Sequence, residues 1–158
     1  MFTKFQKTLY PPFEKPVLVW DGDCGFCKYW VIRWKLHTGI SINYIPYQQI
    51  AHKFKDIPLK EFKKASRFID TDGFIYSGPD SAYKTLSFKN GKSHLHNWYH
   101  KYKWFTWLSD FGYNTIAKNR SFMFKLSKAF FGSNPKSFKP YWILYLLIII
   151  VFIFLISA

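Results

Sequence analysis

Two cysteines, Cys24 and Cys27, are the only thiols in the 158-residue chain, and only Gly25 and Phe26 separate them. Thiols at this spacing can form a reversible disulfide, attack another disulfide or supply two ligands to a metal. An apolar run at 17–20 precedes the pair and helix-like periodicity follows it, which places it where a strand turns into a helix. Unpaired N–H groups at a helix start stabilise a thiolate. We therefore predict that Cys24 attacks a disulfide and that Cys27 resolves the mixed disulfide.

The neighbours of the two cysteines are further candidate site residues. Asp21 lies three residues before the first cysteine. It either relays the proton of Cys27 or raises the pKa of a thiol as a neighbouring negative charge, and the sequence leaves both roles open. Gly25 is expected to leave the backbone accessible to a partner. Trp20 and Phe26 complete the predicted substrate-contact surface.

Other interpretations of the cysteine pair are possible. The two cysteines could be buried and inert. A zinc site would need two more ligands, such as His96 and His100, four residues apart on a predicted helix, but the chain has no second C-x-x-C. Covalent haem attachment is excluded because Lys28 follows the second cysteine, and an iron–sulfur cluster would need ligands from a second chain. We predict no metal and no cofactor, with His94, His96 and His100 solvated or stacked on aromatic rings.

The elements that must position the cysteines follow from apolar periodicity and turn residues. A strand at 17–20, a helix from 24 to about 37 and a strand at 40–47 form a βαβ unit, whose two strands should be parallel. The remaining predictions are one or two short helices across 47–64 broken at Pro58, a hairpin turning at Thr71-Asp72-Gly73, a helix from Pro79, and a helical region at 95–131 broken near Gly112.

The last 18 residues, 141–158, carry no charged side chain, so the formal net charge of +14 lies entirely in residues 1–140. Their composition predicts a membrane-spanning helix, with a buried core helix as the alternative. Four lysines precede this segment, no positive residue follows it, and the first 15 residues lack a signal-peptide core. The positive-inside rule therefore predicts a single-pass protein with a cytoplasmic N-terminal domain.

The composition excludes several classes of protein. Aromatic residues make up 23% of the chain, which is incompatible with a disordered tail, a collagen-like chain or a disulfide-dense scaffold. The lysines are dispersed and no nucleic-acid motif is present, so we predict an anionic lipid surface rather than nucleic acid as the basic chain's partner. The basic, aromatic segment 113–131 either lies on that surface or packs on the domain.

Three blocks of the sequence resemble the DCC family of thiol-disulfide oxidoreductases, named for a D-x-x-C-x-x-C motif. WDGDCGFC supplies Asp21, Cys24 and Cys27, and FIDTDGFIYSG followed by Ser81-Ala82 is similar to the family's middle block. The C-terminal block is DFGYNTIAKNRSF, and the resemblance covers about residues 16 to 125. It implies a thioredoxin-like fold and dithiol–disulfide exchange, with the two cysteines as the redox pair. Its matching residues in the C-terminal block are Asp110, Tyr113, Ala117, Asn119 and Arg120.

The chain departs from typical thioredoxins at one position. Thioredoxins carry a cis-proline before the first strand of the hairpin, facing the cysteines, whereas this chain has Lys64-Ala65-Ser66 there. Ser66 is therefore expected near the sulfur atoms, as part of the substrate-binding surface.

Together these observations predict an α/β chain with a thioredoxin-like domain, a helical C-terminal extension and one C-terminal transmembrane helix. The predicted divisions are an arm (1–15), the domain with its extension (16–131), a linker (132–140) and the anchor (141–158). The predicted function is a membrane-anchored oxidoreductase that reduces protein disulfides, including those of a membrane protein, at the cytoplasmic face. The alternative is a non-enzymatic membrane adaptor whose thiols are structural or bind a metal.

Overall fold

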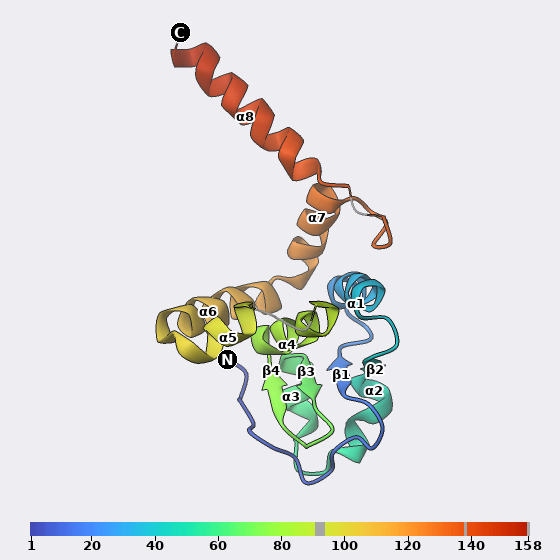
Figure 1. The fold of residues 1–158 in the computed structure, drawn as a ribbon. Helices are drawn as coiled ribbons and strands as arrows, with labels where there is room; N and C mark the ends of the chain where they lie inside the picture. The colour runs from blue at the N-terminus through green and yellow to red at the C-terminus, as the bar shows by residue number, and fades with distance from the viewer. Residues whose placement is uncertain (91–93, 138, 158) are drawn as a thin grey trace.

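A computed structural model describes residues 1–90, 94–137 and 139–157 (Figure 1). Its centre is a four-stranded sheet in the order β2-β1-β3-β4. The strands are β1 (Val17–Trp20), β2 (Asn43–Pro46), β3 (Arg67–Ile69) and β4 (Ile75–Ser77). β1 and β2 are parallel, as the βαβ interpretation predicts, whereas β3 is antiparallel to both β1 and β4.

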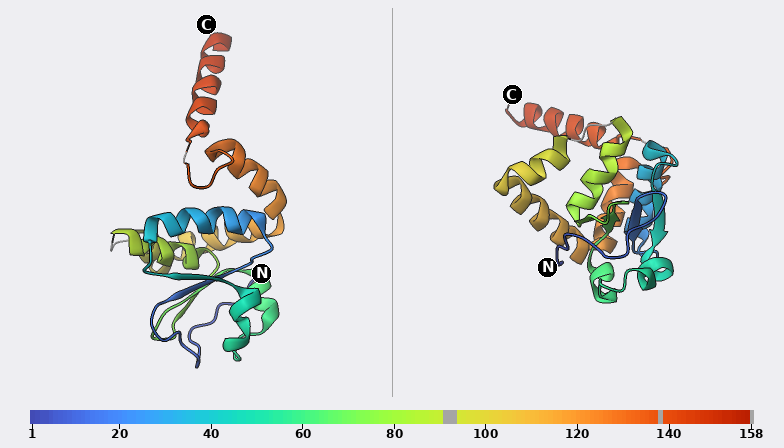
Figure 2. Two further views of the ribbon diagram at one scale, coloured as in Figure 1. Left: turned by 90° about the vertical axis from the view of Figure 1, so that its right-hand side faces the viewer. Right: turned by 60° about the horizontal axis from the view of Figure 1, so that its bottom comes forward.

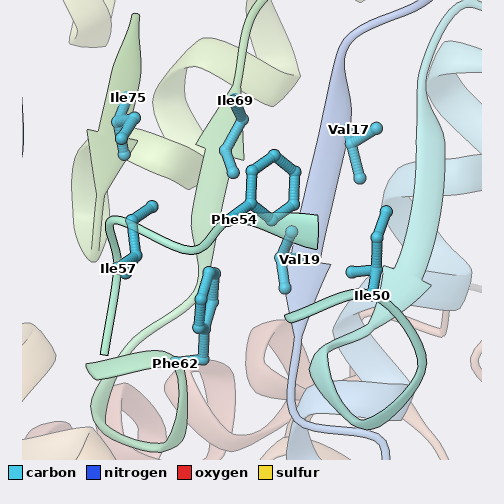
Figure 3. Packing of buried hydrophobic residues seen from close by; sticks show 8 residues of the cluster. All are labelled: Val17, Val19, Ile50, Phe54, Ile57, Phe62, Ile69 and Ile75. Carbon is cyan, nitrogen blue, oxygen red and sulfur yellow. The ribbon is translucent and has the colours of Figure 1, made fainter. Parts of the chain in front are cut away.

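Helices cover both faces of the sheet, because alternate residues of its buried strands point to opposite sides. α1 (Gly25–Thr38) and α4 (Pro79–Asn90) lie on one face, where Leu18 and Phe68 are fully buried (Figure 2). α2 (Tyr47–Ile50), the 3₁₀ turn η1 (Ala51–Lys53) and α3 (Leu59–Lys64) cover the other face. Side chains from this part of the chain pack there against side chains of the strands. The cluster that they form is shown in Figure 3 and consists of Val17, Val19, Ile50, Phe54, Ile57, Phe62, Ile69 and Ile75. This mixed sheet between two helical layers is compatible with a thioredoxin-like domain.

The turns follow the sequence signals closely, with one difference. The hairpin turns at Gly73, which has a φ of +88° and donates its N–H to the Asp70 carbonyl. The strand predicted at 40–47 begins only at Asn43. Gly39 ends α1 with a φ of +58°, and Ile40 behind it is exposed, so the chain first has to turn back towards the sheet.

The first residues of the chain pack along the edge of the sheet at β4. The Ile75 N–H donates to the Gln6 carbonyl, and Lys7 forms an isolated antiparallel bridge with Phe74. The buried Arg67 guanidinium donates to the Thr3 carbonyl, the Ser77 hydroxyl and the backbone carbonyl of Glu61. The arm is thereby joined to the middle of the sheet.

Three helices follow the sheet: α5 (His94–Lys101), α6 (Lys103–Lys118) and α7 (Arg120–Phe131). The break predicted near Gly112 is wrong, because α6 continues through this residue and ends at Lys118. A single glycine inside a helix costs only about 1 kcal/mol, which packing overcomes. α7 packs on α1, with the Phe124 and Tyr29 rings 6.1 Å apart, although Phe122 on α7 stays exposed.

The C-terminal helix α8 (Tyr141–Ser157) projects from the rest of the chain in Figure 1. The predicted transmembrane helix at 141–158 is wrong: within the described residues, no helix combines the length and apolarity needed to cross a membrane. α8 has 17 residues, which at about 1.5 Å each is shorter than the hydrocarbon core of about 30 Å. The lipid surface stays a prediction.

Candidate active site

A tight loop carries the chain from β1 into α1 and fixes the position of the first cysteine. The Cys24 N–H donates to the Asp21 carbonyl, and the Asp23 N–H donates to the Asp21 carboxylate. Gln48 on α2 holds the loop from the other side, since its Oε1 accepts the Gly22 N–H and its Nε2 donates to both aspartates. The loop therefore delivers Cys24 to the first turn of α1 in a defined orientation.

Cys24 is the N-cap of α1, and its sulfur accepts two hydrogen bonds from Cys27. The backbone N–H of Cys27 lies 3.2 Å from the Cys24 Sγ, and the Cys27 Sγ lies 2.7 Å from it. Both cysteines are free thiols and partly exposed. The arrangement is that of a reduced dithiol in which the second thiol solvates the first.

The pKa values of the two thiols are shifted in opposite directions. The donated Cys27 thiol proton is the largest influence on Cys24 and, with the Cys27 N–H and the Arg120 charge, lowers the pKa of Cys24 to about 6, against partial burial and the Asp21 charge. At pH 7 a thiol with that pKa is about 90% thiolate, compared with a few per cent for an unperturbed one. The hydrogen bond to Cys24, burial and the Cys24 charge all raise the pKa of Cys27. At neutral pH the reduced pair therefore favours a thiolate at Cys24 and a protonated thiol at Cys27.

Arg120, the first residue of α7, is a fixed positive charge beside this pair. Its Nη1 donates to the Asp21 carboxylate at 2.7 Å, and its Nη2 donates to the backbone carbonyls of Lys63 and Lys64. The side chains of Asp21 and Arg120 are about one-fifth exposed. In the described residues, no hydrogen bond joins the Asp21 carboxylate to either sulfur. Asp21 thus orients Arg120 and slightly raises the pKa of both thiols, the second of its predicted roles.

Ser66 lies just before β3 and lines a cavity that Cys27 and residues of α7 also line. Its N–H donates to the Tyr113 hydroxyl at 3.0 Å, and its hydroxyl is 2.8 Å from that of Ser81. Burial raises the pKa of Tyr113, so this hydroxyl stays protonated. No cis peptide bond occurs in the described residues, so the loop at 64–66 follows an ordinary trans path.

A largely apolar cavity of about 310 Å³ opens beside Cys27. Its polar lining is confined to a few groups, among them Cys27, Ser66, Tyr113 and Arg120. The remaining walls come from β1, α1 and the helical extension, chiefly Trp20, Phe26, Trp30, Ile116, Met123 and Phe130. The structure therefore places an apolar recess beside the sulfur that resolves a mixed disulfide.

The predicted contact residues are not all placed alike. Trp20 and Phe26 line the cavity with Cys27 and Ser66. Gly25 differs, because a Cβ there would lie 3.1 Å from the Phe124 ring of α7. A side chain at this position would therefore meet α7. Gly25 itself is exposed, and its contact with a partner stays a prediction.

Three residues that sequence reasoning did not assign to the site contribute to it: Gln48, Tyr113 and Arg120. Tyr113 and Arg120 fall in the block DFGYNTIAKNRSF, which resembles a family motif, so that block was the available signal. No sequence signal identified Gln48. Its contacts with Gly22, Asp21 and Asp23 depend on how the loop after β1 folds against α2.

Comparison with known proteins gives one match. A family model described as DCC1-like thiol-disulfide oxidoreductase matches residues 18–126, which include the dithiol, Ser66 and Arg120. No curated protein and no solved structure matches the chain.

Proposed function

The chain belongs to the DCC1-like thiol-disulfide oxidoreductase family, and on that premise we propose that it exchanges disulfides with protein partners through Cys24 and Cys27. The observation that carries the proposal is the asymmetry of the pair: one sulfur has its pKa lowered to about 6, and its neighbour has a raised pKa. Thiolate attack needs an ionised first thiol, while the second must not compete for the partner.

The first step joins the chain to its partner. The Cys24 thiolate attacks one sulfur of a partner disulfide, the partner's S–S bond breaks, and its other sulfur leaves as a thiolate that takes up a proton. The product is a mixed disulfide on Cys24. As its negative charge is lost, the hydrogen bond that keeps the Cys27 proton in place weakens, so the pKa of Cys27 falls.

The second step releases the partner. Cys27 gives its proton to water, attacks the Cys24 sulfur and forms the Cys24–Cys27 disulfide, while the partner leaves as a dithiol. Arg120 remains close to both sulfurs and favours the anionic form of each. Two electrons pass from the chain to the partner, and a thiol reductant must restore the dithiol before the next cycle.

We propose reduction of the partner as the working direction, in which the dithiol is the starting form. The lowered pKa of Cys24 stabilises that form, so the reduction potential should be less negative than the roughly −270 mV of thioredoxin. The partners so reduced would carry disulfides with higher potentials, which are strained or exposed. The apolar cavity beside Cys27 would receive an apolar side chain next to such a disulfide.

The direct test is mixed-disulfide trapping with the full chain. The Cys27→Ser variant, mixed with a disulfide-linked model peptide, should accumulate a covalent adduct on Cys24 that mass spectrometry identifies. The Cys24→Ser variant is the matched control and should form less adduct, because the burial that raises the pKa of Cys27 persists when the Cys24 sulfur is removed. Equal labelling of both variants, or of neither, would contradict the proposal.

The same test addresses the adaptor alternative. An adaptor with structural thiols would give no adduct, and a metal site at the thiols would give adduct only after a chelator is added. Among the described residues, the candidate cluster of three metal-ligand side chains lies elsewhere, at Asp80, His96 and His100. Within the same described residues, no such cluster includes Cys24 or Cys27.

A further inference from the structure

A second cluster of chemically capable side chains joins α4 to α5. Asp80 is the second residue of α4, and His96 and His100 lie four residues apart on one face of α5. The His96 Nδ1 lies 2.7 Å from one Asp80 carboxylate oxygen, and the His100 Nε2 lies 2.9 Å from the other. One ligand atom from each of the three residues falls within 4.8 Å of the others.

In the described residues, Asp80 forms no ion pair with a lysine or an arginine. The residue is only 4% exposed, and its ion-pair partners in the described residues are the two histidines, with no lysine or arginine among them. The nearby Lys84 is paired with Asp70 instead. A buried carboxylate needs a cation or several donors to offset its lost hydration. Among the described residues, the groups in direct contact with the carboxylate that can offset its charge are the imidazole N–H groups, and a metal ion can take the place of their protons.

The imidazole rings are held by their neighbours. The Tyr76 ring meets the His96 ring edge-on at 5.2 Å between centroids, and the two imidazole rings are 4.7 Å apart. Each imidazole nitrogen that faces Asp80 has to carry a proton to bond to the carboxylate. In a tetrahedral zinc site the ligand atoms are about 3.4 Å apart. To admit an ion in place of those protons, the spacings of 2.7 and 2.9 Å have to widen by about 0.5 to 0.7 Å, and the widest spacing in the cluster, which is at most 4.8 Å, has to shorten.

We propose that Asp80, His96 and His100 bind a divalent transition-metal ion, with zinc as the reference ion. Two imidazoles and a carboxylate are ligands that suit such ions. The side chain of His100 is 55% exposed, and Asp80 and His100 line a cavity of about 490 Å³, so water can complete the coordination. This cavity shares no lining residue with the cavity beside Cys27. The ion would link α5 to α4.

The test uses the full chain carrying Cys24→Ser and Cys27→Ser, so that thiols cannot bind the metal. Titration with Zn²⁺ against a chromophoric chelator should give one equivalent per chain. Cobalt(II) should give visible absorption bands without the near-ultraviolet sulfur-to-cobalt band that thiolate ligands produce. Zn²⁺ should also raise the Tm, because it binds only the folded chain. The result does not depend on the proposed redox function.

Two histidine variants locate the site. His100→Ala removes an exposed side chain, so folding should be preserved while the Zn²⁺ affinity falls by about 100-fold. His94→Ala is the matched control, since His94 lies on the same helix about 200° away from His96 and is exposed. Its affinity should equal that of the parent. Absence of saturable one-equivalent binding, or equal losses in both variants, would overturn the proposal.

Discussion

Asp21 and Asp80 follow two strands that run in the same direction, yet their carboxylates have different partners. The register of β1, β3 and β4 sets Val19, Arg67 and Ser77 side by side, so both aspartates lie beyond the same end of the sheet. Asp21 is paired with an arginine at 2.7 Å, whereas the ion-pair partners of Asp80 among the described residues are imidazoles. A guanidinium stays charged at every accessible pH, but an imidazole exchanges its proton for a metal near neutrality.

The different partners of Asp21 and Asp80 suit two different functions, disulfide exchange and metal binding, at the same end of the sheet. At the dithiol, Arg120 is a constant positive charge that favours a thiolate whatever the conditions. At the Asp80 cluster, the compensating charge is exchangeable, and the site suits a ligand that comes and goes. If this is correct, each region should be disabled without affecting the other.

The largest expected effect is this reciprocal loss. Cys24→Ser should reduce the rate of disulfide exchange by at least about 10³-fold, because the attacking atom is removed, and leave Zn²⁺ affinity unchanged. His100→Ala should do the reverse. Exchange with a chromogenic disulfide and Zn²⁺ titration measure the two properties on the same samples. Loss of both properties in either variant would show that the two regions are coupled.

Removing the fixed positive charge should have the next largest effect. Arg120→Gln should raise the pKa of Cys24 by about one unit, since a nearby opposite charge favours the charged form. The alkylation rate at pH 6 should then fall several-fold. Lys118→Gln removes the same charge from an exposed position two residues earlier and should change neither quantity. An unchanged Cys24 pKa in Arg120→Gln would assign the lowering to Cys27 and the helix start alone.

A backbone variant tests the loop that aims Asp21 at Arg120. A Cβ on Gly22 would lie 2.9 Å from the Pro46 Cβ and 3.1 Å from Gln48 Oε1, so Gly22→Ala should lower the free energy of unfolding by about 1–3 kcal/mol. Gly112→Ala meets no atom within 4 Å inside α6 and should stabilise the chain by roughly 0.5–1 kcal/mol. Urea denaturation distinguishes the two. Equal effects would mean that the loop is not tightly packed.

A further expected effect is a pH dependence of stability that comes from Cys24. Its pKa is about 6 in the folded chain against 9.0 for an unperturbed thiol, so the unfolded state binds more protons between these values. The contribution is fully present above pH 9 and is lost as the pH falls through 6. The free energy of unfolding should therefore rise more from pH 6 to 9 in the parent than in Cys24→Ser. Parallel curves would contradict this sign.

The sequence predicted the dithiol because every part of it is local. A buried strand, a turn rich in Asp and Gly, and a helix start lie within about ten residues, and the parallel β1–β2 pair follows from the same βαβ pattern. Arg120 is 99 residues from Asp21 and reaches it only because α7 packs its Phe124 ring against Gly25. That contact depends on the angle between α1 and α7, and the periodicity of apolar residues does not predict this angle.

The Asp80 cluster and the C-terminal helix are two further features that the sequence predicted only in part. The spacing of His96 and His100 indicates a shared helix face, but nothing near Asp80 in the sequence indicates that α4 turns this carboxylate towards it. The apolar composition of residues 141–158 predicted a helix, which the structure has at Tyr141–Ser157, but it predicted a membrane span wrongly, because composition does not supply the length that a span needs.

The central claim, that Cys24 is ionised near neutrality and Cys27 is not, is tested most directly by the pH dependence of alkylation. The reduced full chain is treated with iodoacetamide between pH 4 and 10, and mass spectrometry measures modification at each cysteine. The account predicts modification of Cys24 first, with a midpoint near pH 6, and of Cys27 only at alkaline pH. A midpoint for Cys24 at or above the ordinary value of about 8.5, or earlier modification of Cys27, would contradict it.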